Sequence, residues 1–384
     1  MNKFAFIEEE LTKLNDRYQR RALRSFTPLS AVELMVNGQT LVNFSSNDYL
    51  GLSKHPLLKE RAKEFMERYG AGSTASRLIC GSYDCFEKVE NKLATLKGTT
   101  SALILNSGFQ ANVSILPALA DGRTLLLSDW LNHNSIVNGA MLSRCHVTPF
   151  RHNDLAHLSS LLEENQKKGF SRILIVTESV FSVDGDRCDI DGLIELAEEF
   201  QAMLIVDEAH ATGLFGERGM GLTAGKPVDI TIGTFGKACG SFGAYASCSE
   251  DMRDYLVNCC SGFIYTTAMP PSVVGSIDAA LDLIPQMDNE RRDLHKMAEY
   301  LRTSLHNLGW RTGKSTTQII PVIVGDEQRT LALSRWLEKE GFLATALRPP
   351  TVGQGDSRIR LALSTAHTLE QVDRLIDAFR KWCE

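Results

Sequence analysis

The sequence has no long apolar run, no excess of positive charge and no CxxC cysteine pair, and each absence excludes a class of protein. No stretch approaches the roughly 20 apolar residues of a transmembrane helix. The N-terminus turns acidic after a few apolar residues, unlike a signal peptide. We therefore expect a cytoplasmic protein without a membrane partner. The net charge of -6 argues against a nucleic-acid partner, although an anionic small molecule needs only a local basic patch. The nine scattered cysteines favour free thiols over disulfides or a metal site, so no metal is expected.

The chain is long enough for two domains and has the composition of an ordinary globular protein. Its 384 residues are 43% hydrophobic and 23% charged. Short apolar, largely β-branched runs alternate with amphipathic stretches, which predicts strands at 102–105, 124–128, 173–176, 203–206 and 230–233. Buried strands separated by helices predict an α/β fold with a mainly parallel central sheet that is flanked by helices.

The pattern divides the chain into an N-terminal helix and arm (1–40), a large domain (41–288) and a smaller α/β C-terminal domain (289–384). In the smaller domain we expect helices up to about 308 and at 327–340 and 368–382, with strands at 319–324, 343–346 and 358–363. Thr368 is the expected cap of the last helix.

Four arginines near the N-terminus follow helical spacing. Arg17, Arg20, Arg21 and Arg24 lie at i, i+3, i+4 and i+7, so a helix would place them on one face. Such a face would be a local basic patch for an anionic ligand. A solvated charged face is at least as good an interpretation for Arg17 and Arg20.

Ligands of α/β sheets bind beyond the carboxyl ends of the strands, so the residues that follow each strand are the candidates for chemistry. Asp207 directly follows the run 203–206, and His210 comes three residues later. A carboxylate there could keep the pyridine nitrogen of pyridoxal-5′-phosphate (PLP) protonated, and the imidazole could reach the ring oxygen. From these two residues alone, a structural or metal-binding role is equally open.

The next strand, 230–233, leads into Thr234 and Lys237. The amine of a partly desolvated lysine beside a cationic ring can be neutral and nucleophilic, as a Schiff-base lysine must be. The hydroxyl of Thr234 could donate to the cofactor phosphate. A lone lysine is more often a solvated loop residue.

Two more strand ends could complete a cofactor site. Gly108 and Phe109 begin a predicted helix after the run 102–105, and a helix N-terminus suits a phosphate group. His133 follows the run 124–128 and could stack on a flat ring, although a lone histidine more often has a structural role.

Longer motifs occur in a fixed order along the chain. They are 43–52 (NFSSNDYLGL), 177–186 (TESVFSVDGD), 207–210 (DEAH), 234–237 (TFGK) and 265–271 (YTTAMPP). Together they resemble the α-oxoamine synthase family of fold-type-I PLP enzymes over nearly the whole chain.

The resemblance implies a PLP-dependent transferase and a role for each matching residue. Lys237 matches the lysine that holds PLP, Asp207 the partner of the pyridine nitrogen, His210 the contact of the ring hydroxyl and His133 the residue that stacks on the ring. These four are the expected catalytic residues. The remaining cofactor site would consist of Gly108, Phe109, Ser182, Thr234 and Thr267. Thr267 resembles a phosphate ligand that the neighbouring subunit supplies, which implies a homodimer with shared active sites.

The segments 347–352 (LRPPTV) and 358–361 (RIRL) resemble one branch of this family most closely. That branch condenses L-alanine with a pimeloyl thioester in biotin biosynthesis and releases carbon dioxide and the free thiol carrier, which is coenzyme A or an acyl-carrier protein. By this match Arg360 binds the amino-acid carboxylate, which suits a planar guanidinium. The further substrate-side residues would be Arg24, Asn47, His133 and Thr351. From the residues alone, Arg360 could instead pair with a surface acid.

Three departures leave the acyl substrate open. The segment 72–81 (GSTASRLICG) is more similar to the branches that use glycine or serine with acetyl-CoA or a longer acyl-CoA. Phe86 stands where a histidine is common in the family, and Gly353 stands where a proline is common. A non-catalytic partner subunit is a further hypothesis, but such a subunit would have no chemical need for Lys237. A PLP aminotransferase is another, and it would convert alanine to pyruvate.

Overall fold

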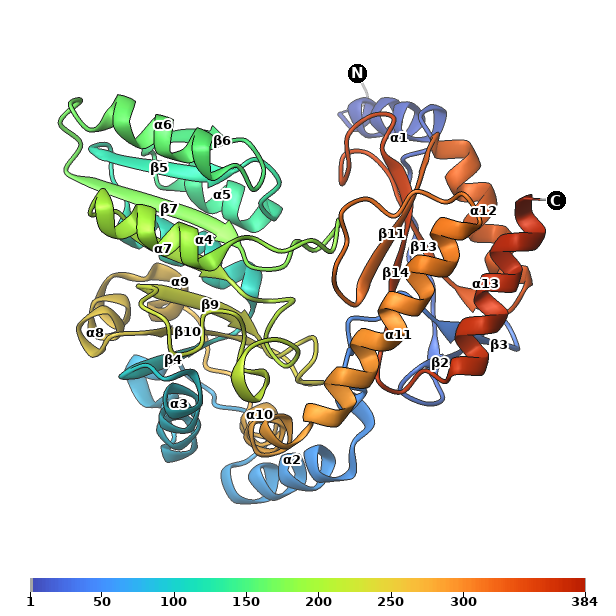
Figure 1. The fold of residues 1–384 in the computed structure, drawn as a ribbon. Coiled ribbons are helices and arrows are strands. Elements are labelled where there is room, and N and C mark those ends of the chain that lie inside the picture. Colours follow the sequence, from blue (N-terminus) through green and yellow to red (C-terminus); the bar gives the residue numbers. More distant parts are fainter. Residues whose placement is uncertain (1–2, 384) are drawn as a thin grey trace. The chain divides into compact units, whose positions relative to one another are not determined.

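The computed structural model describes residues 3–383, which form two compact units (Figure 1). The larger unit comprises Asp48–Ser182 and Asp186–Arg292, and the smaller one comprises Met1–Asn47, Val183–Gly185 and Asp293–Glu384. The division of the chain into domains at residues 40 and 288 stays a prediction.

A seven-stranded sheet in the order β4-β10-β9-β8-β7-β5-β6 forms the centre of the larger unit. The strands from β9 to β6 in this order run parallel, whereas β10 is antiparallel to both of its neighbours. The mainly parallel sheet that the sequence predicted is therefore confirmed. The strands are β4 (Ser101–Leu105), β5 (Thr124–Asp129), β6 (His146–Phe150), β7 (Arg172–Glu178), β8 (Met203–Asp207), β9 (Ile230–Thr234) and β10 (Ala244–Cys248).

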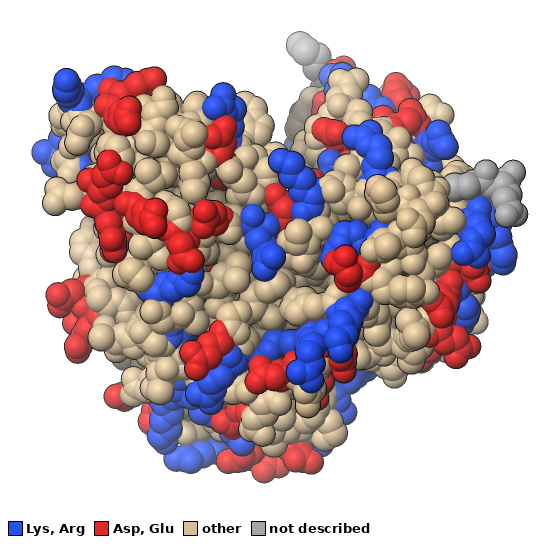
Figure 2. All heavy atoms as spheres, in the orientation of Figure 1, with Lys and Arg blue, Asp and Glu red and all other residues tan. Residues whose placement is uncertain are grey.

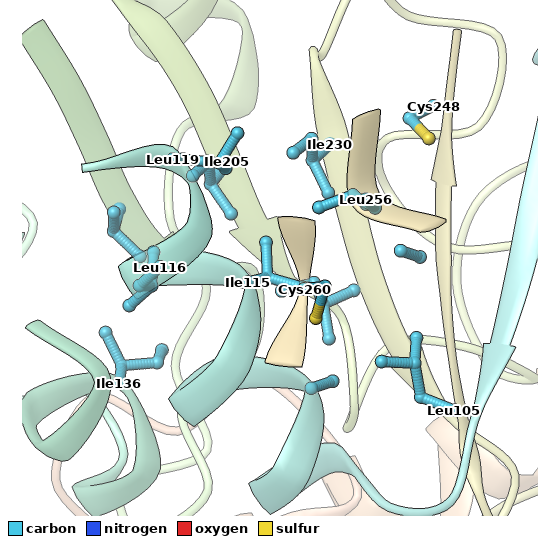
Figure 3. Packing of buried hydrophobic residues seen from close by; sticks show 14 of the residues in the cluster. Leu105, Ile115, Leu116, Leu119, Ile136, Ile205, Ile230, Cys248, Leu256 and Cys260 are labelled. Atoms are coloured by element: carbon cyan, nitrogen blue, oxygen red, sulfur yellow. The ribbon is translucent and has the colours of Figure 1, made fainter. Parts of the chain in front are cut away.

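Both faces of this sheet are buried, because alternate side chains of a strand point to opposite faces. In β8, Ile205 belongs to one cluster of buried apolar side chains, and Leu204 and Val206 belong to the other. Figure 3 shows the cluster around Ile205, which includes Ile115 and Leu116 of a covering helix. The sheet is thereby fixed between two helical layers, and its carboxyl-terminal edge is a rigid base for a site.

The helices of the larger unit are α2 (Pro56–Tyr69), α3 (Asp84–Lys97), α4 (Gly108–Leu119), α5 (Asn134–Leu142), α6 (Leu155–Asn165), α7 (Ile190–Glu199), α8 (Glu250–Cys259), α9 (Ser261–Ile264) and α10 (Pro271–Leu283). Several begin at a side chain that accepts a free backbone N–H. Ser107, Asp154 and Ser249 do so for α4, α6 and α8. These caps fix where each strand-to-helix loop ends.

The smaller unit contains two sheets, in the orders β1-β2-β3-β12 and β11-β14-β13. The strands are β1 (Thr27–Pro28), β2 (Glu33–Val36), β3 (Gln39–Asn43), β11 (Ile319–Gly325), β12 (Phe342–Leu343), β13 (Thr345–Leu347) and β14 (Ser357–Ala362). The single strand predicted at 343–346 is thus divided between the two sheets. The helices are α1 (Ala5–Asp16), α12 (Glu327–Lys339) and α13 (Leu369–Cys383), together with most of α11 (Asp288–Asn307). Thr368 caps α13 as predicted, because its Oγ1 accepts the Gln371 N–H at 3.2 Å.

The predicted arginine face on the N-terminal helix is wrong. Helix α1 ends at Asp16, before the first of the four arginines. Tyr18 adopts a left-handed conformation (φ 57°), and the Gln19 N–H bonds to the Leu14 carbonyl at 2.8 Å. This reversal is the usual way to satisfy the last carbonyls of a helix, although glycine is the commoner residue at the left-handed position. The chain from residue 19 to 26 is therefore not helical.

Two strands of the central sheet, β6 and β10, were not predicted from the sequence. β6 lies at an edge of the sheet, carries His146 and Pro149, and is largely exposed, whereas the antiparallel β10 is rich in small residues.

No helix among residues 3–383 is both long enough and apolar enough to cross a membrane. Figure 2 shows acidic as well as basic side chains over the face in view.

Candidate functional site

A pocket of about 340 Å³ opens in the larger unit at the carboxyl ends of β8 and β9 and the start of α4. Seven of the predicted cofactor residues line it: Gly108, Phe109, His133, Asp207, His210, Thr234 and Lys237. They lie at or just after the ends of four strands, β4, β5, β8 and β9, and the fold brings them together. Among the residues that the structure describes, no group of His, Cys, Asp and Glu side chains could hold a metal ion.

Asp207 is the last residue of β8, and its side chain is buried. Its Oδ1 accepts the backbone N–H of Ala209 and its Oδ2 accepts the side-chain amide of Asn112, both at 2.8 Å. A buried carboxylate needs such donors or a cation. The two bonds orient Asp207 within the pocket, where it can face a protonated ring nitrogen.

A hydrogen-bonded chain connects Asp207 to His133. The Asn112 amide also donates to Ser135 Oγ at 2.9 Å, and Ser135 Oγ lies 2.7 Å from His133 Nδ1. Burial lowers the pKa of His133, while the charge of Asp207 acts in the opposite direction. His133 therefore presents a neutral imidazole near neutral pH, which suits packing against a flat ring.

Lys237 lies in the turn between β9 and β10, and its Nζ is 2.9 Å from His210 Nε2. On the other side of the imidazole, Nδ1 lies 2.6 Å from the hydroxyl of Tyr49. Tyr49 is fully buried and belongs to the NFSSNDYLGL motif. The tyrosine fixes the orientation of His210, and His210 in turn holds the amine of Lys237 in the pocket.

The N-terminus of α4 forms the end of the pocket that suits a phosphate. The backbone N–H groups of the first helical turn and the helix dipole attract an anion there. A side chain at Gly108 would approach Thr234 Cγ2 to 2.6 Å, so only glycine permits this contact between α4 and β9. Thr234 also lines the pocket, and its hydroxyl lies 3.5 Å from the Ala209 carbonyl.

Glu178 is a pocket residue that the sequence analysis missed. It is the last residue of β7 and pairs in register with Asp207 on β8. Its Oε1 accepts the His133 backbone N–H at 2.6 Å, and its carboxylate also accepts the Ser182 N–H. Burial, together with the charge of Asp207, raises the pKa of Glu178 to about 8. Its position at a strand end, directly comparable to Asp207, was the signal that could have revealed it.

The residues of the pocket fit PLP. The pocket offers a carboxylate for the pyridine nitrogen, a lysine for the aldehyde, a neutral histidine beside the ring space and a helix N-terminus for the phosphate. Two predicted cofactor residues, Ser182 and Thr267, are not among those that line it. Thr267 accepts a bond from the Asn106 amide through its carbonyl at 2.8 Å. The roles of both residues stay predictions.

The predicted substrate residues other than His133 belong to the smaller unit. Arg360 lies on β14, and its Nη2 donates to Asn47 Oδ1 at 3.1 Å. Thr351 accepts a hydrogen bond from Arg21 at 3.0 Å. Arg24 makes two hydrogen bonds of 2.8 Å to the carboxylate of Glu338. Arg24 and Arg360 are the two arginines predicted to bind an anionic substrate. Of these, Arg24 is already paired with an acid, Glu338.

A hollow of about 730 Å³ in the smaller unit is lined by several basic side chains. Its lining includes Arg20, Arg21, Arg24, Arg348 and Thr351. Burial lowers the pKa of Arg348, and the charge of Arg21 adds to this effect. Several guanidinium groups around one hollow favour an anionic ligand. The chain therefore has a local basic site, although it is built from an extended segment and not from a helical face.

Comparison with known proteins identifies the family. The family model for aminotransferase class I and II matches residues 39–379. A protein from Desulfosudis oleivorans, provisionally named 8-amino-7-oxononanoate synthase, is 59% identical over 100% of this chain and 99% of its own. The 8-amino-7-oxononanoate synthase of Gluconacetobacter diazotrophicus is 49% identical over 97% and 96%.

Solved structures agree with this relationship. A serine palmitoyltransferase from S. paucimobilis, with a bound PLP–myriocin aldimine, matches with a TM-score of 0.90 and 26% identity, over 99% of this chain and 97% of its own. The fold-type-I PLP transferase architecture predicted from the sequence is thereby confirmed, and PLP is the cofactor. The chain belongs to the class I and II aminotransferase family and, within it, to the α-oxoamine synthases, and it is a PLP-dependent acyltransferase.

Proposed function

We propose that this enzyme condenses L-alanine with a pimeloyl thioester to give 8-amino-7-oxononanoate, carbon dioxide and the free thiol carrier, as a step of biotin biosynthesis. The observation that carries the proposal is the name shared by relatives that are 59% and 49% identical over almost the whole chain. We further propose that it acts as a homodimer in the cytoplasm, with the segment around Thr267 contributing to the site of the neighbouring subunit.

Three of the predicted site residues, Lys237, Asp207 and Arg360, have a defined task in this proposed reaction. PLP, when bound, supplies an electron sink for the electron pair left at the α-carbon of the amino acid. Arg360 binds the carboxylate of alanine through its planar guanidinium. The amine of Lys237 removes the α-proton, and Asp207 keeps the proton on the ring nitrogen. The α-carbon then bonds to the thioester carbonyl carbon, and the thiolate leaves and takes up a proton. The carboxylate leaves as carbon dioxide, and the α-carbon takes up a second proton in its place.

The hollow in the smaller unit supports an anionic acyl substrate. Pimeloyl thioesters carry a free carboxylate at the far end of the acyl chain, and both possible carriers carry phosphate. The guanidinium groups of Arg21 and Arg348 line this hollow, and Arg21 also binds Thr351. Arg24 forms an ion pair with Glu338, so a substrate that binds Arg24 would have to compete with this carboxylate.

The proposal is tested by supplying purified holoenzyme with L-alanine and either pimeloyl-CoA or pimeloyl-acyl-carrier protein. Thiol release together with a product of the mass of 8-amino-7-oxononanoate is the expected result. The alternative follows from the similarity to serine palmitoyltransferase, so L-serine with palmitoyl-CoA and glycine with acetyl-CoA are run in parallel. Faster turnover with either of these pairs would replace the proposed function by another α-oxoamine synthesis.

Arg360→Ala is expected to raise the KM for alanine about 10- to 100-fold, because a hydrogen-bonded charge pair contributes roughly 1.5–3 kcal/mol. The KM for the acyl thioester should change little. Steady-state kinetics with each substrate varied in turn measures both values. Arg335→Ala, which removes an exposed arginine of α12, is the control. An unchanged KM for alanine would show that the carboxylate binds elsewhere.

A further inference from the structure

His152 is a histidine outside the cofactor pocket that bonds to a carboxylate on each side of its ring. Nδ1 lies 2.9 Å from Asp129 Oδ1, and Nε2 lies 2.8 Å from Asp186 Oδ2. Both carboxylates are buried. Since an ionised carboxylate only accepts hydrogen bonds, both ring nitrogens must donate, and His152 is an imidazolium.

The two carboxylates stand at the bases of two different loops. Asp129 ends β5 and begins the loop to His133, where its Oδ1 also accepts the Leu131 N–H at 2.8 Å. Asp186 lies in the loop after β7, and its carbonyl accepts the Phe181 N–H at 3.0 Å, next to Ser182. The loop between β5 and α5 carries His133 and is called the His133 loop, and the loop between β7 and α7 carries Ser182 and is called the Ser182 loop. His152 therefore joins the base of one loop to the base of the other.

Neighbouring contacts reinforce this connection. The backbone N–H of Asn153 donates to Asp129 Oδ2, and its side-chain amide donates to Asp186 Oδ2, both at 2.9 Å. The ring of His152 packs edge-on against Phe181, with centroids 4.4 Å apart. At the pocket end, Glu178 joins the same two loops through the N–H groups of His133 and Ser182. Two separate cross-links thus hold one pair of loops.

We propose that His152 is a positioning residue, whose imidazolium joins Asp129 to Asp186 and so holds the His133 loop and the Ser182 loop in the arrangement that binds PLP. The inference rests on the proposed roles of His133 and Ser182 at the cofactor. Buried charge clusters are weak evidence for a stabilising role alone, because apolar replacements are often at least as stable. The specific function of this cluster is the link between two site loops.

The charge on His152 depends on pH in a defined direction. Burial alone would lower the pKa of His152, but the hydrogen bonds and charges of Asp129 and Asp186 outweigh burial and raise it to about 9. These two carboxylates are the charged groups that act on the ring. Because the pKa is raised by folding, the link is complete below about pH 6.5, the ordinary value for histidine, and is lost as the pH rises through about 9.

The test compares the wild type with His152→Gln, which can donate from only one end of its side chain. Hydrogen exchange of the cofactor-free protein, read by mass spectrometry, is expected to become about tenfold faster in peptides that cover 129–135 and 179–189 together. The dissociation constant of PLP, titrated at pH 7, should rise by a similar factor. His146→Gln, an exposed histidine of β6, is the control and should change neither value.

Unchanged exchange in either loop would overturn the proposal, and so would faster exchange with unchanged PLP affinity. If His152→Gln fails to fold, the wild type alone provides the test. After correction for intrinsic exchange, its two loops should lose protection together as the pH rises past about 9. Both readouts are independent of the acyl substrate. A protein that ignores pimeloyl thioesters but passes these tests would lose the proposed function and keep this inference.

Discussion

Lys237→Ala is expected to abolish turnover, with kcat falling by at least about 10³-fold, and to remove the visible absorbance band of lysine-bound PLP. The amine has two tasks that no neighbour can take over: it holds the cofactor covalently and it moves the α-proton. General base catalysis alone contributes about 10²- to 10⁴-fold. His210 lies 2.9 Å from the amine, but Tyr49 fixes it on the other side of the ring.

The spectrum and the rate are both needed, because they separate loss of binding from loss of chemistry. PLP should still bind to Lys237→Ala with reduced affinity, since the helix N-terminus and Asp207 remain. Lys226→Ala is a matched control, because Lys226 precedes β9 and forms a surface ion pair with Asp191. Normal turnover in Lys237→Ala would end the assignment of this lysine.

The central sheet and most of the pocket could be predicted from the sequence because both depend on local patterns. Each buried parallel strand reads as a short apolar run, and the residue after the run lies at the carboxyl edge of the sheet. Asp207, Thr234 and Lys237 were found in this way, and the structure places all three around one pocket. The edge strand β6 and the antiparallel β10 lack such runs, so the pattern did not mark them.

The residues that the sequence did not reveal act through long-range contacts. Asn112 is a polar residue inside the apolar helix α4, and its amide reaches Asp207, 95 positions away. No local rule predicts that pairing, although a buried asparagine in an apolar helix is a signal that it has a partner. The end of α1 was missed for a different reason. Tyr18 takes a left-handed position that usually holds glycine, so the sequence carried no stop signal there.

Asp207→Asn is the second substitution with a large expected effect: kcat should fall about 10²- to 10⁴-fold, while PLP affinity falls much less. The side-chain shape is kept, and the asparagine Oδ1 can still accept the Ala209 N–H. The negative charge is lost, so the ring nitrogen is no longer held protonated and the electron sink is weakened. The amide group would also face the donating amide of Asn112, which now bonds to Asp207 at 2.8 Å.

A double variant separates these two causes. In Asn112→Ala the charge of Asp207 remains but one orienting bond is lost, so kcat should fall by about tenfold only. If the opposed amides at positions 112 and 207 caused most of the loss of kcat, adding Asn112→Ala to Asp207→Asn would remove this conflict and restore activity. If the lost negative charge causes most of it, the double variant should stay as slow as Asp207→Asn. Asp229→Asn is the control, because its carboxylate accepts the Leu204 N–H near the opposite end of β8. A kcat for Asp207→Asn close to that of Asp229→Asn would contradict the role of Asp207. It would mean that the ring nitrogen of bound PLP needs no negative charge beside it, and the buried carboxylate of Asp207 would then have no chemical function.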